Sequence, residues 1–445
     1  MPLTFLTRLL LGVLSILWIA LAVYLLWSWQ DGRVVTDPAG EAVRVYEDWR
    51  LWGALGLIAW SLLGHVPLRF LLARGDRDKT KAERGNGAII DGPDGARLYV
   101  ESHGPADAPA LVLTHGWGLD STIWYYARRA LGDRFRVVVW DLPGLGRSRG
   151  NISLEAFARD LGRVVEWTGG PVVLVGHSIG GMAIQTLIRD GEPAVRNQVK
   201  GVVLLNTTYT NPLKTMIASP VMRALRHPVL EPLMWVAIVL QPVIWLFAWQ
   251  GYLNGSAHLA HRLGFGRYVT RSQLDHTSLL STRNPPGASA RGNLAMFAWD
   301  ATDAVRGFDG PLLVVTGHAD IVTLPSAGEA IRNAAPLGRR LDIEGVNHMG
   351  LLERHDLYNA AISEFAVEAF AHVATPAPAT NDPRSGLAQG GLGHDEDQLL
   401  EDGQEEVFSR AEVESGLIEH HADTEVTPDD EGVRPPFPAG TLGHG

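Results

Sequence analysis

The chain has 445 residues, a formal net charge of −11 at neutral pH and no cysteine. The absence of cysteine excludes disulfides, thiolate metal sites and a cysteine nucleophile. Sixteen acidic and three basic residues lie between residue 375 and the C-terminus, so the preceding part is nearly neutral. That part lacks the clustered basic face of a nucleic-acid-binding protein, and we expect no nucleic acid partner.

An uncharged apolar run covers residues 9–30. At a rise of about 1.5 Å per residue, a helix of this length crosses a hydrocarbon core of about 30 Å. The apolar region of a cleavable signal peptide, the alternative, has only about 7–15 residues. The run also ends in Trp27, Trp29 and Gln30, a pattern typical of a membrane interface. We therefore expect a retained transmembrane helix.

A second uncharged run, residues 51–68, is shorter and is interrupted by His65 and Pro67. We predict a helix at about 51–72 that either crosses the membrane or lies in its interface. By the positive-inside rule, the basic residues that follow should be cytoplasmic; they are Arg69, Arg74, Arg77, Lys79, Lys81 and Arg84. We favour a hairpin anchor (1–75) and a charged linker (76–86), with the main domain on the cytoplasmic face of the cell membrane. If the second run does not cross, that domain lies on the other side.

Six short apolar runs without alternation follow the linker, at 110–116, 135–144, 171–181, 199–208, 311–320 and 339–348. Helical patterns separate several of them, including 121–131 and 154–167, and a predicted antiparallel pair (87–90 and 96–104) precedes them. Short buried strands that alternate with helices indicate an α/β fold with a mostly parallel sheet covered on both faces. In such sheets, functional groups lie at the carboxyl ends of the strands.

Residues 211–305 interrupt this alternation of strands and helices. We predict that they form a helical cap inserted between two parts of the core, 87–210 and 306–374. The segment 229–250 is apolar enough to suggest a third membrane span, but Glu231, Pro232, Gln241 and Pro242 argue against one. A single crossing there would also separate the parts of the site described below. Residues 375–445 have the composition of a disordered acidic tail, which could also bind a protein partner.

The sequence Gly176-His177-Ser178-Ile179-Gly180 stands between a predicted strand and a predicted helix. It fits the G-x-S-x-G nucleophile elbow, in which glycines permit a strained turn that exposes the serine. The alternative is a strand–turn–helix whose glycines serve packing alone. A serine hydroxyl becomes a nucleophile only with a base, a group that orients the base and donors for an oxyanion.

Two further motifs follow strands: His115-Gly116-Trp117-Gly118 and the turn from Asp141 to Ser148. With these motifs the chain resembles the α/β-hydrolase superfamily from about residue 87 to residue 371. The resemblance implies an α/β-hydrolase sheet with an inserted cap. It also implies an oxyanion hole made by the backbone N–H groups of Trp117 and Ile179, and a structural role for Asp141.

The resemblance also implies a base and an acid after the cap. Asp320 ends the run 311–320 in an acid-bearing turn, and His348 ends the run 339–348 in a histidine loop. The order Ser178, Asp320, His348 is the order of this fold. Some members carry the acid one strand earlier, but that position holds Asn206 here, which favours Asp320. Asp320 would then orient His348, the general base.

A serine at the elbow argues against the epoxide-opening and dehalogenating relatives, whose nucleophile is an aspartate. We expect a membrane-anchored hydrolase of carboxylic esters, and the apolar cap and anchor favour a lipophilic or lipid ester. The alternatives are an acyltransferase with the same triad and a non-catalytic membrane scaffold. We expect no metal, because no pair of histidines has convincing ligand spacing, and no cofactor.

Overall fold

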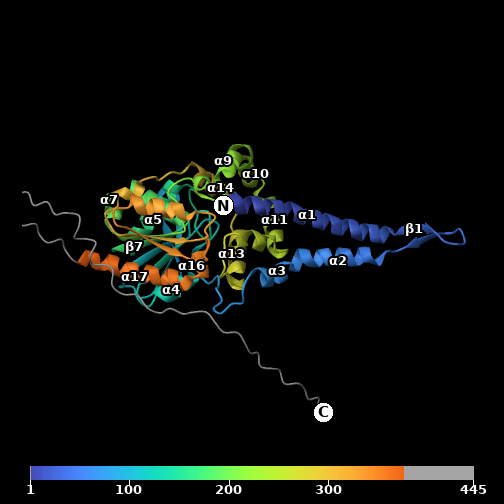
Figure 1. Ribbon diagram of the computed structural model, residues 1–445, viewed down its shortest axis with the longest axis horizontal. Coiled ribbons are helices and arrows are strands. Elements are labelled where there is room, and N and C mark those ends of the chain that lie inside the picture. The colour runs from blue at the N-terminus through green and yellow to red at the C-terminus, as the bar shows by residue number, and fades with distance from the viewer. Residues whose placement is uncertain (1, 375–445) are drawn as a thin grey trace, which may run out of the picture. The chain divides into compact units, whose positions relative to one another are not determined.

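The computed structural model describes residues 2–374, so the predicted acidic tail at 375–445 lies outside the described residues. An eight-stranded sheet lies among helices of the core (Figure 1). Its strand order is β10-β9-β8-β7-β5-β6-β4-β3. All neighbouring strands pair in parallel except β3 with β4 and β4 with β6. The predicted mostly parallel sheet is therefore confirmed. Its strands are β3 (Ala88–Asp91), β4 (Arg97–His103), β5 (Ala110–Thr114), β6 (Arg136–Trp140), β7 (Val172–His177), β8 (Val199–Leu205), β9 (Leu312–Gly317) and β10 (Gly338–Ile343).

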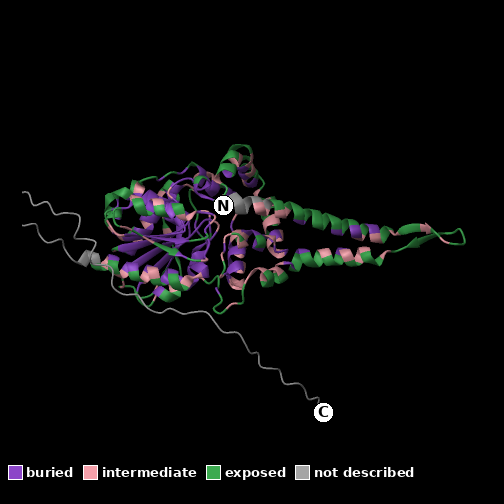
Figure 2. Ribbon diagram, in the orientation of Figure 1, coloured by how far each residue is buried: buried purple, intermediate pink, exposed green. Residues whose placement is uncertain are grey.

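The central strands are buried on both faces, as Figure 2 shows. Val175 of β7 lies beside Leu113 of β5 on one side and Val203 of β8 on the other, and all three side chains are fully buried. Helices cover both faces, which explains the unalternating apolar runs in the sequence. These helices are α4 (Tyr125–Leu131), α5 (Leu154–Thr168), α6 (Ile179–Asp190), α7 (Pro193–Arg196), α15 (Pro325–Ala334), α16 (Gly350–Glu353) and α17 (His355–Ala374).

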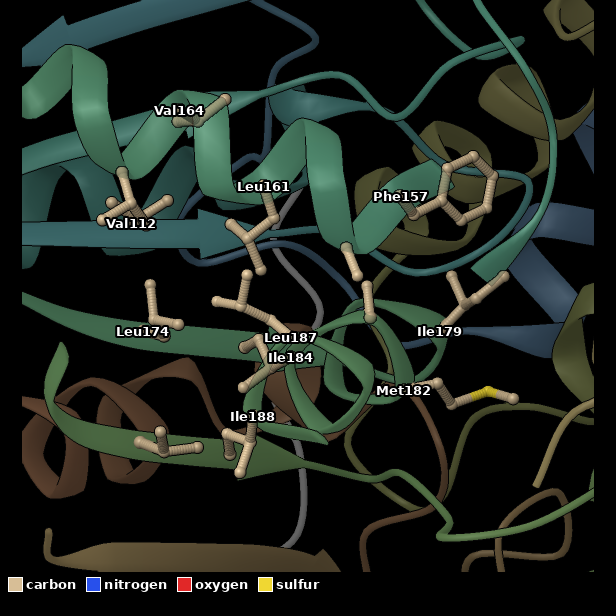
Figure 3. Close-up of a cluster of buried hydrophobic side chains, with 14 of the residues drawn as sticks. Val112, Phe157, Leu161, Val164, Leu174, Ile179, Met182, Ile184, Leu187 and Ile188 are labelled. Carbon is tan, nitrogen blue, oxygen red and sulfur yellow. The ribbon is translucent and has the colours of Figure 1, made fainter. Parts of the chain in front are cut away.

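Helices α5 and α6 pack together on one face of the sheet (Figure 3). Phe157 and Leu161 of α5 and Leu187 of α6 join one buried cluster with Val112 and Leu174 of the strands. Helices α4 and α17 contribute to a second cluster on the opposite face. Full burial of a side chain of this size contributes about 1.5–3 kcal/mol to the stability of the fold. The packing of these side chains therefore holds α6, and the turn before it, firmly against the sheet.

Seven helices lie between β8 and β9, within the predicted cap. Several of them share a small core of their own that includes Met222, Met234 and Phe297. The segment 219–253 is not one straight rod, because its two halves are bent by 101° around Leu240. The helices are α8 (Pro212–Thr215), α9 (Ser219–Leu225), α10 (Glu231–Val239), α11 (Gln241–Leu253), α12 (Ser256–Arg262), α13 (Arg271–Arg283) and α14 (Pro286–Ala298), with a π-helical turn at Arg226–Leu230.

The N-terminal helix α1 (Pro2–Asp31) contains a segment, Leu10–Asp31, that is long and apolar enough to cross a membrane. It lies against α2 (Asp48–Leu63). The predicted helix at 51–72 is instead two helices, α2 and α3 (His65–Leu72), bent by 64°. Gly64 at the bend approaches the cap so closely that a Cβ there would lie 2.5 Å from the carbonyl oxygen of Asn254. Between α1 and α2, the strands β1 (Arg33–Thr36) and β2 (Ala42–Val45) form an antiparallel hairpin that the sequence did not suggest.

Polar contacts join these N-terminal helices to the cap. Asn254 Nδ2 donates to Ser15 Oγ of α1 at 2.6 Å, and His65 Nδ1 donates to the carbonyl oxygen of Leu253 at 2.9 Å. Arg69 pairs with Asp275 of α13 at 3.3 Å. The predicted anchor therefore packs directly on the cap.

Candidate active site

The turn after β7 holds Ser178 in a backbone conformation with φ 54° and ψ −119°. Such a conformation costs on the order of 1–3 kcal/mol for a residue other than glycine. The motif's two glycines allow the turn to close. A Cβ on Gly176 would lie 2.6 Å from the carbonyl carbon of Gly180, and a Cβ on Gly180 would lie 2.3 Å from the carbonyl oxygen of Thr114. The G-x-S-x-G spacing therefore meets a steric demand of this turn.

The three residues predicted to form a triad lie together and are buried. Ser178 Oγ lies 3.1 Å from His348 Nε2, and His348 Nδ1 lies 3.0 Å from Asp320 Oδ2. They follow β7, β9 and β10, at the carboxyl edge of the sheet. With the imidazole proton on Nδ1, His348 donates to Asp320 and its Nε2 can accept the proton of Ser178, the arrangement that a serine nucleophile needs.

Donors surround the carboxylate of Asp320. Its Oδ2 also accepts from Asn206 Nδ2 at 2.9 Å and Thr323 Oγ1 at 2.8 Å, and its Oδ1 accepts from the N–H groups of Val322 and Thr323 at 2.8 and 2.9 Å. Burial opposes ionisation, but the neighbouring His348 and these hydrogen bonds together lower the pKa of Asp320. The carboxylate therefore remains charged at neutral pH and holds the proton on His348 Nδ1.

Asn206 occupies the position where some members of the superfamily carry the acid, and its side chain supports Asp320 directly. It follows β8 with a φ of 44°, and its Oδ1 accepts a hydrogen bond from Tyr358 at 2.7 Å. Burial raises the pKa of Tyr358 well above its usual value, so the hydroxyl remains a donor. The tyrosine thereby fixes the Asn206 amide with its NH₂ group toward Asp320. The position of Asn206 at the end of a central strand is the signal that could have revealed its role.

The two backbone N–H groups predicted to form the oxyanion hole have no hydrogen-bond acceptor among the described residues. Ile179 opens helix α6, whose N-terminus favours negative charge. The Trp117 side chain fixes the other loop: its Nε1 donates to the carbonyl oxygen of Ser289 at 2.9 Å, and its ring lies 5.8 Å from that of Phe157. Both N–H groups are thus free to donate to an anionic oxygen.

Two further histidines lie close to the triad without contacting the serine oxygen. His177 Nε2 donates to the carbonyl oxygen of His348 at 3.0 Å, and burial lowers the pKa of His177 to about 3. His115 Nδ1 donates to the carbonyl oxygen of Gly116, and its Nε2 accepts from the N–H of Leu142 at 3.0 Å. Burial lowers the pKa of His115 as well. Both are neutral at pH 7, and their hydrogen bonds hold the loops around the site.

Asp141 lies at the centre of a separate hydrogen-bonded group. It accepts from Arg84 Nη1 at 2.9 Å and from the N–H groups of Arg147 and Ser121, both at 2.8 Å. Arg84 also pairs with Asp120 at 2.6 Å. Since Arg84 belongs to the predicted linker at 76–86, that segment is packed onto the core at this point rather than fully solvated.

Two cavities border the site. A cavity of about 300 Å³ begins at His348 and the Trp117 loop and extends between the cap helices α10, α11 and α12 to helix α1. A much smaller cavity, of about 10 Å³, lies beside Ser178 and has a largely apolar wall that includes Met182, Met296 and Phe297. The site therefore borders a space between the cap and α1 that has room for an apolar chain.

Within residues 2–374, no three histidine, aspartate or glutamate side chains are arranged to bind a metal ion. The expectation that the protein uses no metal or cofactor remains a prediction.

A family model described as "Alpha/beta hydrolase family" matches residues 111–361. The chain is also similar to the pimeloyl-[acyl-carrier protein] methyl ester esterase of Nitrosospira multiformis, with 40% identity over 118 residues. That match covers 25% of this chain and only 42% of the relative. With the enzyme of the same name from Yersinia pseudotuberculosis, identity is 26% over 282 residues, 61% of this chain and 98% of the relative.

Among solved structures, the chain is similar to a thermophilic esterase from Thermogutta terrifontis. The sequences are 24% identical, the TM-score is 0.51, and the match covers 64% of this chain and 99% of that one. At this identity the likeness concerns the fold.

Proposed function

The chain belongs to the alpha/beta hydrolase family, and from that premise we propose that it is a membrane-anchored serine esterase with the triad Ser178, His348 and Asp320. The observation that carries the proposal is the continuous hydrogen-bonded line from Ser178 Oγ through His348 to a buried carboxylate. Esterase relatives that share the family support the reaction class.

In the proposed reaction, Ser178 Oγ attacks the ester carbonyl carbon while its proton moves to His348 Nε2. The carbonyl oxygen becomes an oxyanion and accepts hydrogen bonds from the N–H groups of Trp117 and Ile179. Asp320 stabilises the imidazolium that forms. His348 then gives its proton to the leaving alkoxide, and the alcohol departs, leaving an acyl group on Ser178.

Deacylation repeats these steps with water as the nucleophile. His348 takes a proton from the water as its oxygen attacks the acyl carbon, and returns that proton to Ser178 Oγ as the carboxylic acid leaves. An alcohol or amine in place of water would give acyl transfer, because the triad chemistry is the same.

We propose a lipophilic ester as substrate, because the large cavity is lined mainly by apolar side chains. Val236, Ile244 and Phe247 of the cap and Val13 of α1 all border it. Several large apolar side chains on the outer side of α10 and α11 are exposed, among them Trp235, Val239 and Leu246. Exposed apolar surfaces of this kind mark membrane or protein contacts. The cap is therefore suited to contact the bilayer beside the proposed anchor.

An ester series tests the proposed activity. We expect the full chain in neutral detergent micelles to hydrolyse p-nitrophenyl esters, with kcat/KM rising from butyrate to octanoate to palmitate. His348→Ala should lower kcat by about 10⁴–10⁶, whereas His318→Ala, at an exposed histidine, should have no effect. Equal activity of the two variants would refute the assigned base. Ester products formed on addition of a long-chain alcohol would identify an acyltransferase.

We also propose that the catalytic domain is on the cytoplasmic face, from the basic residues that follow the second apolar run. Because the chain has no cysteine, single cysteines report topology without a background. Ala39→Cys lies in the turn between β1 and β2, and Asp309→Cys lies on the catalytic domain. We expect an impermeant maleimide to label only the first in intact cells, and both after permeabilisation. The reverse pattern would place the domain outside.

A further inference from the structure

The N-terminal membrane helix forms part of the wall of the catalytic cavity. Arg8, Gly12 and Ile16, spaced four residues apart on one face of α1, line the same cavity as His348. Val13 joins them. The anchor is therefore placed to contact any molecule that fills this cavity, in addition to holding the enzyme at the membrane.

Arg8 brings a positive charge to the wall of that cavity. Its Nη1 donates to Ser281 Oγ at 3.2 Å and approaches the carbonyl oxygen of the same residue at 3.5 Å. Burial lowers the pKa of Arg8 to about 10, so the guanidinium is still charged at neutral pH. Among the described residues, no carboxylate lies within 4 Å of it.

The surroundings offer no counter-charge. Among the described residues that line the cavity, none is an aspartate or a glutamate. Asp275 of α13 already binds Arg69 at 3.3 Å and His258 at 3.0 Å. The neighbouring His261 donates from Nδ1 to the carbonyl oxygen of Ala257, and burial lowers the pKa of His261 to about 3, so this side chain is neutral.

A partly buried cation without a counter-charge is costly, and proteins normally pair such a group with an anion. The guanidinium binds carboxylates and phosphates through two parallel hydrogen bonds. Arg8 also lies just before Leu10, where the proposed membrane-spanning segment begins, a position at which the charged group of an amphiphile in the bilayer would be found.

We propose that Arg8 binds an anionic group of the substrate, so that the enzyme prefers amphiphilic esters with a carboxylate or phosphate remote from the scissile bond. The ester would lie at Ser178 and His348, the apolar chain would fill the cavity between the cap and α1, and the anion would meet Arg8. The inference rests on the proposed esterase function and specifies its substrate class.

The test compares matched substrates with the full chain in micelles of an uncharged detergent. The substrates are p-nitrophenyl octanoate, the p-nitrophenyl monoester of a dicarboxylic acid of similar length, and the p-nitrophenyl ester of a fatty acid of similar length with a phosphate on its terminal carbon. The variants are Arg8→Gln, Arg8→Lys and, as a control, Arg291→Gln, at an exposed arginine of the cap that does not line the cavity.

We expect the wild type to prefer at least one anionic ester over octanoate in kcat/KM. Arg8→Gln should reduce that preference by about 10–100-fold, through KM, because a charged hydrogen bond is lost. Arg8→Gln should lower hydrolysis of octanoate far less than hydrolysis of the anionic ester, Arg8→Lys should retain part of the preference because it keeps the charge but not the two parallel hydrogen bonds, and Arg291→Gln should behave as wild type. Which anionic ester is preferred separates carboxylate from phosphate recognition.

Three results would overturn the inference: no preference for either anion in the wild type, an equal loss on anionic and neutral esters in Arg8→Gln, or a preference that survives Arg8→Gln. An equal loss would mean that Arg8 supports the fold or pairs with bilayer phosphate. If the wild type hydrolyses none of the esters, the proposed esterase function fails as well, whereas hydrolysis of octanoate without an anion preference refutes the role of Arg8 alone.

Discussion

The substitution Asp320→Asn tests how the site controls the tautomer of His348. All five partners of the Asp320 carboxylate donate: His348 Nδ1, Asn206 Nδ2, the hydroxyl and N–H of Thr323, and the N–H of Val322. An amide has one oxygen and one NH₂ group. In either orientation, therefore, the NH₂ group of an asparagine faces donors.

The least costly orientation keeps the amide oxygen on the two backbone N–H groups and turns the NH₂ group toward His348. Nδ1 must then accept, the imidazole proton moves to Nε2, and Nε2 can no longer take the proton of Ser178. A wrong tautomer of this kind lowers kcat by about 10⁴, or about 5 kcal/mol in the activation barrier. The Asn206 amide also loses its acceptor, which costs about 1–3 kcal/mol of stability.

The assay is steady-state hydrolysis of a p-nitrophenyl ester by the full chain in detergent, with kcat and KM determined separately. We expect the loss in kcat and little change in KM, because Asp320 lies behind His348 and does not touch the substrate. Asp309→Asn, at an exposed carboxylate, is the matched control. Activity of Asp320→Asn within tenfold of wild type, or a loss confined to KM, would refute this reasoning.

Three further substitutions test the surroundings of the site and the core. Asn206→Ala should lower kcat by about tenfold or more and destabilise the fold by about 1–3 kcal/mol, because Asp320 loses a donor and a buried tyrosine hydroxyl loses its acceptor; unchanged kcat and thermal unfolding would contradict the supporting role of Asn206. In Gly292→Ala, the new Cβ would lie 2.0 Å from Trp117 Cζ2. We expect it to displace the Trp117 loop and lower esterase activity at least tenfold, whereas Gly307→Ala, which meets no atom within 4 Å, should be silent. Burial raises the pKa of Asp160 from 3.8 to about 7, so the stability contributed by its protonated form is present below about pH 4 and lost as the pH rises through about 7. Denaturant unfolding should therefore show Asp160→Asn exceeding wild type by on the order of 4 kcal/mol at pH 8, with little gain at pH 4, and an equal gain at both pH values would contradict the shifted pKa.

The parallel sheet and the position of the serine were predictable because each depends on local patterns. Valine-rich runs such as 172–175 form strands wherever both faces are covered, and the glycines that flank Ser178 form a sequence motif that can be recognised within five residues. The order of the predicted acid and base follows from the fold that these strands build. The proximity of Asp320 and His348 to Ser178 is therefore a consequence of topology.

Other features depend on contacts between distant segments and left no local pattern. The break in the second apolar run arises where Gly64 meets the backbone of Asn254, 190 residues further along the chain. Asn206 is oriented by Tyr358 from the last described helix. In the sequence, Arg8 is an ordinary basic residue before a predicted membrane helix, and only the packing of α1 on the cap brings it to the cavity that His348 also lines.

Active-site labelling tests the central claim, that Ser178 is an activated nucleophile, most directly. The full chain in detergent is treated with a fluorophosphonate probe, and the modified peptide is mapped by mass spectrometry. We predict a single phosphonylated site at Ser178 in the wild type and in Ser256→Ala, a control at another cavity-lining serine, and no labelling of Ser178→Ala. Labelling of Ser178→Ala equal to that of the wild type, or a wild type that is not labelled, would contradict the claim.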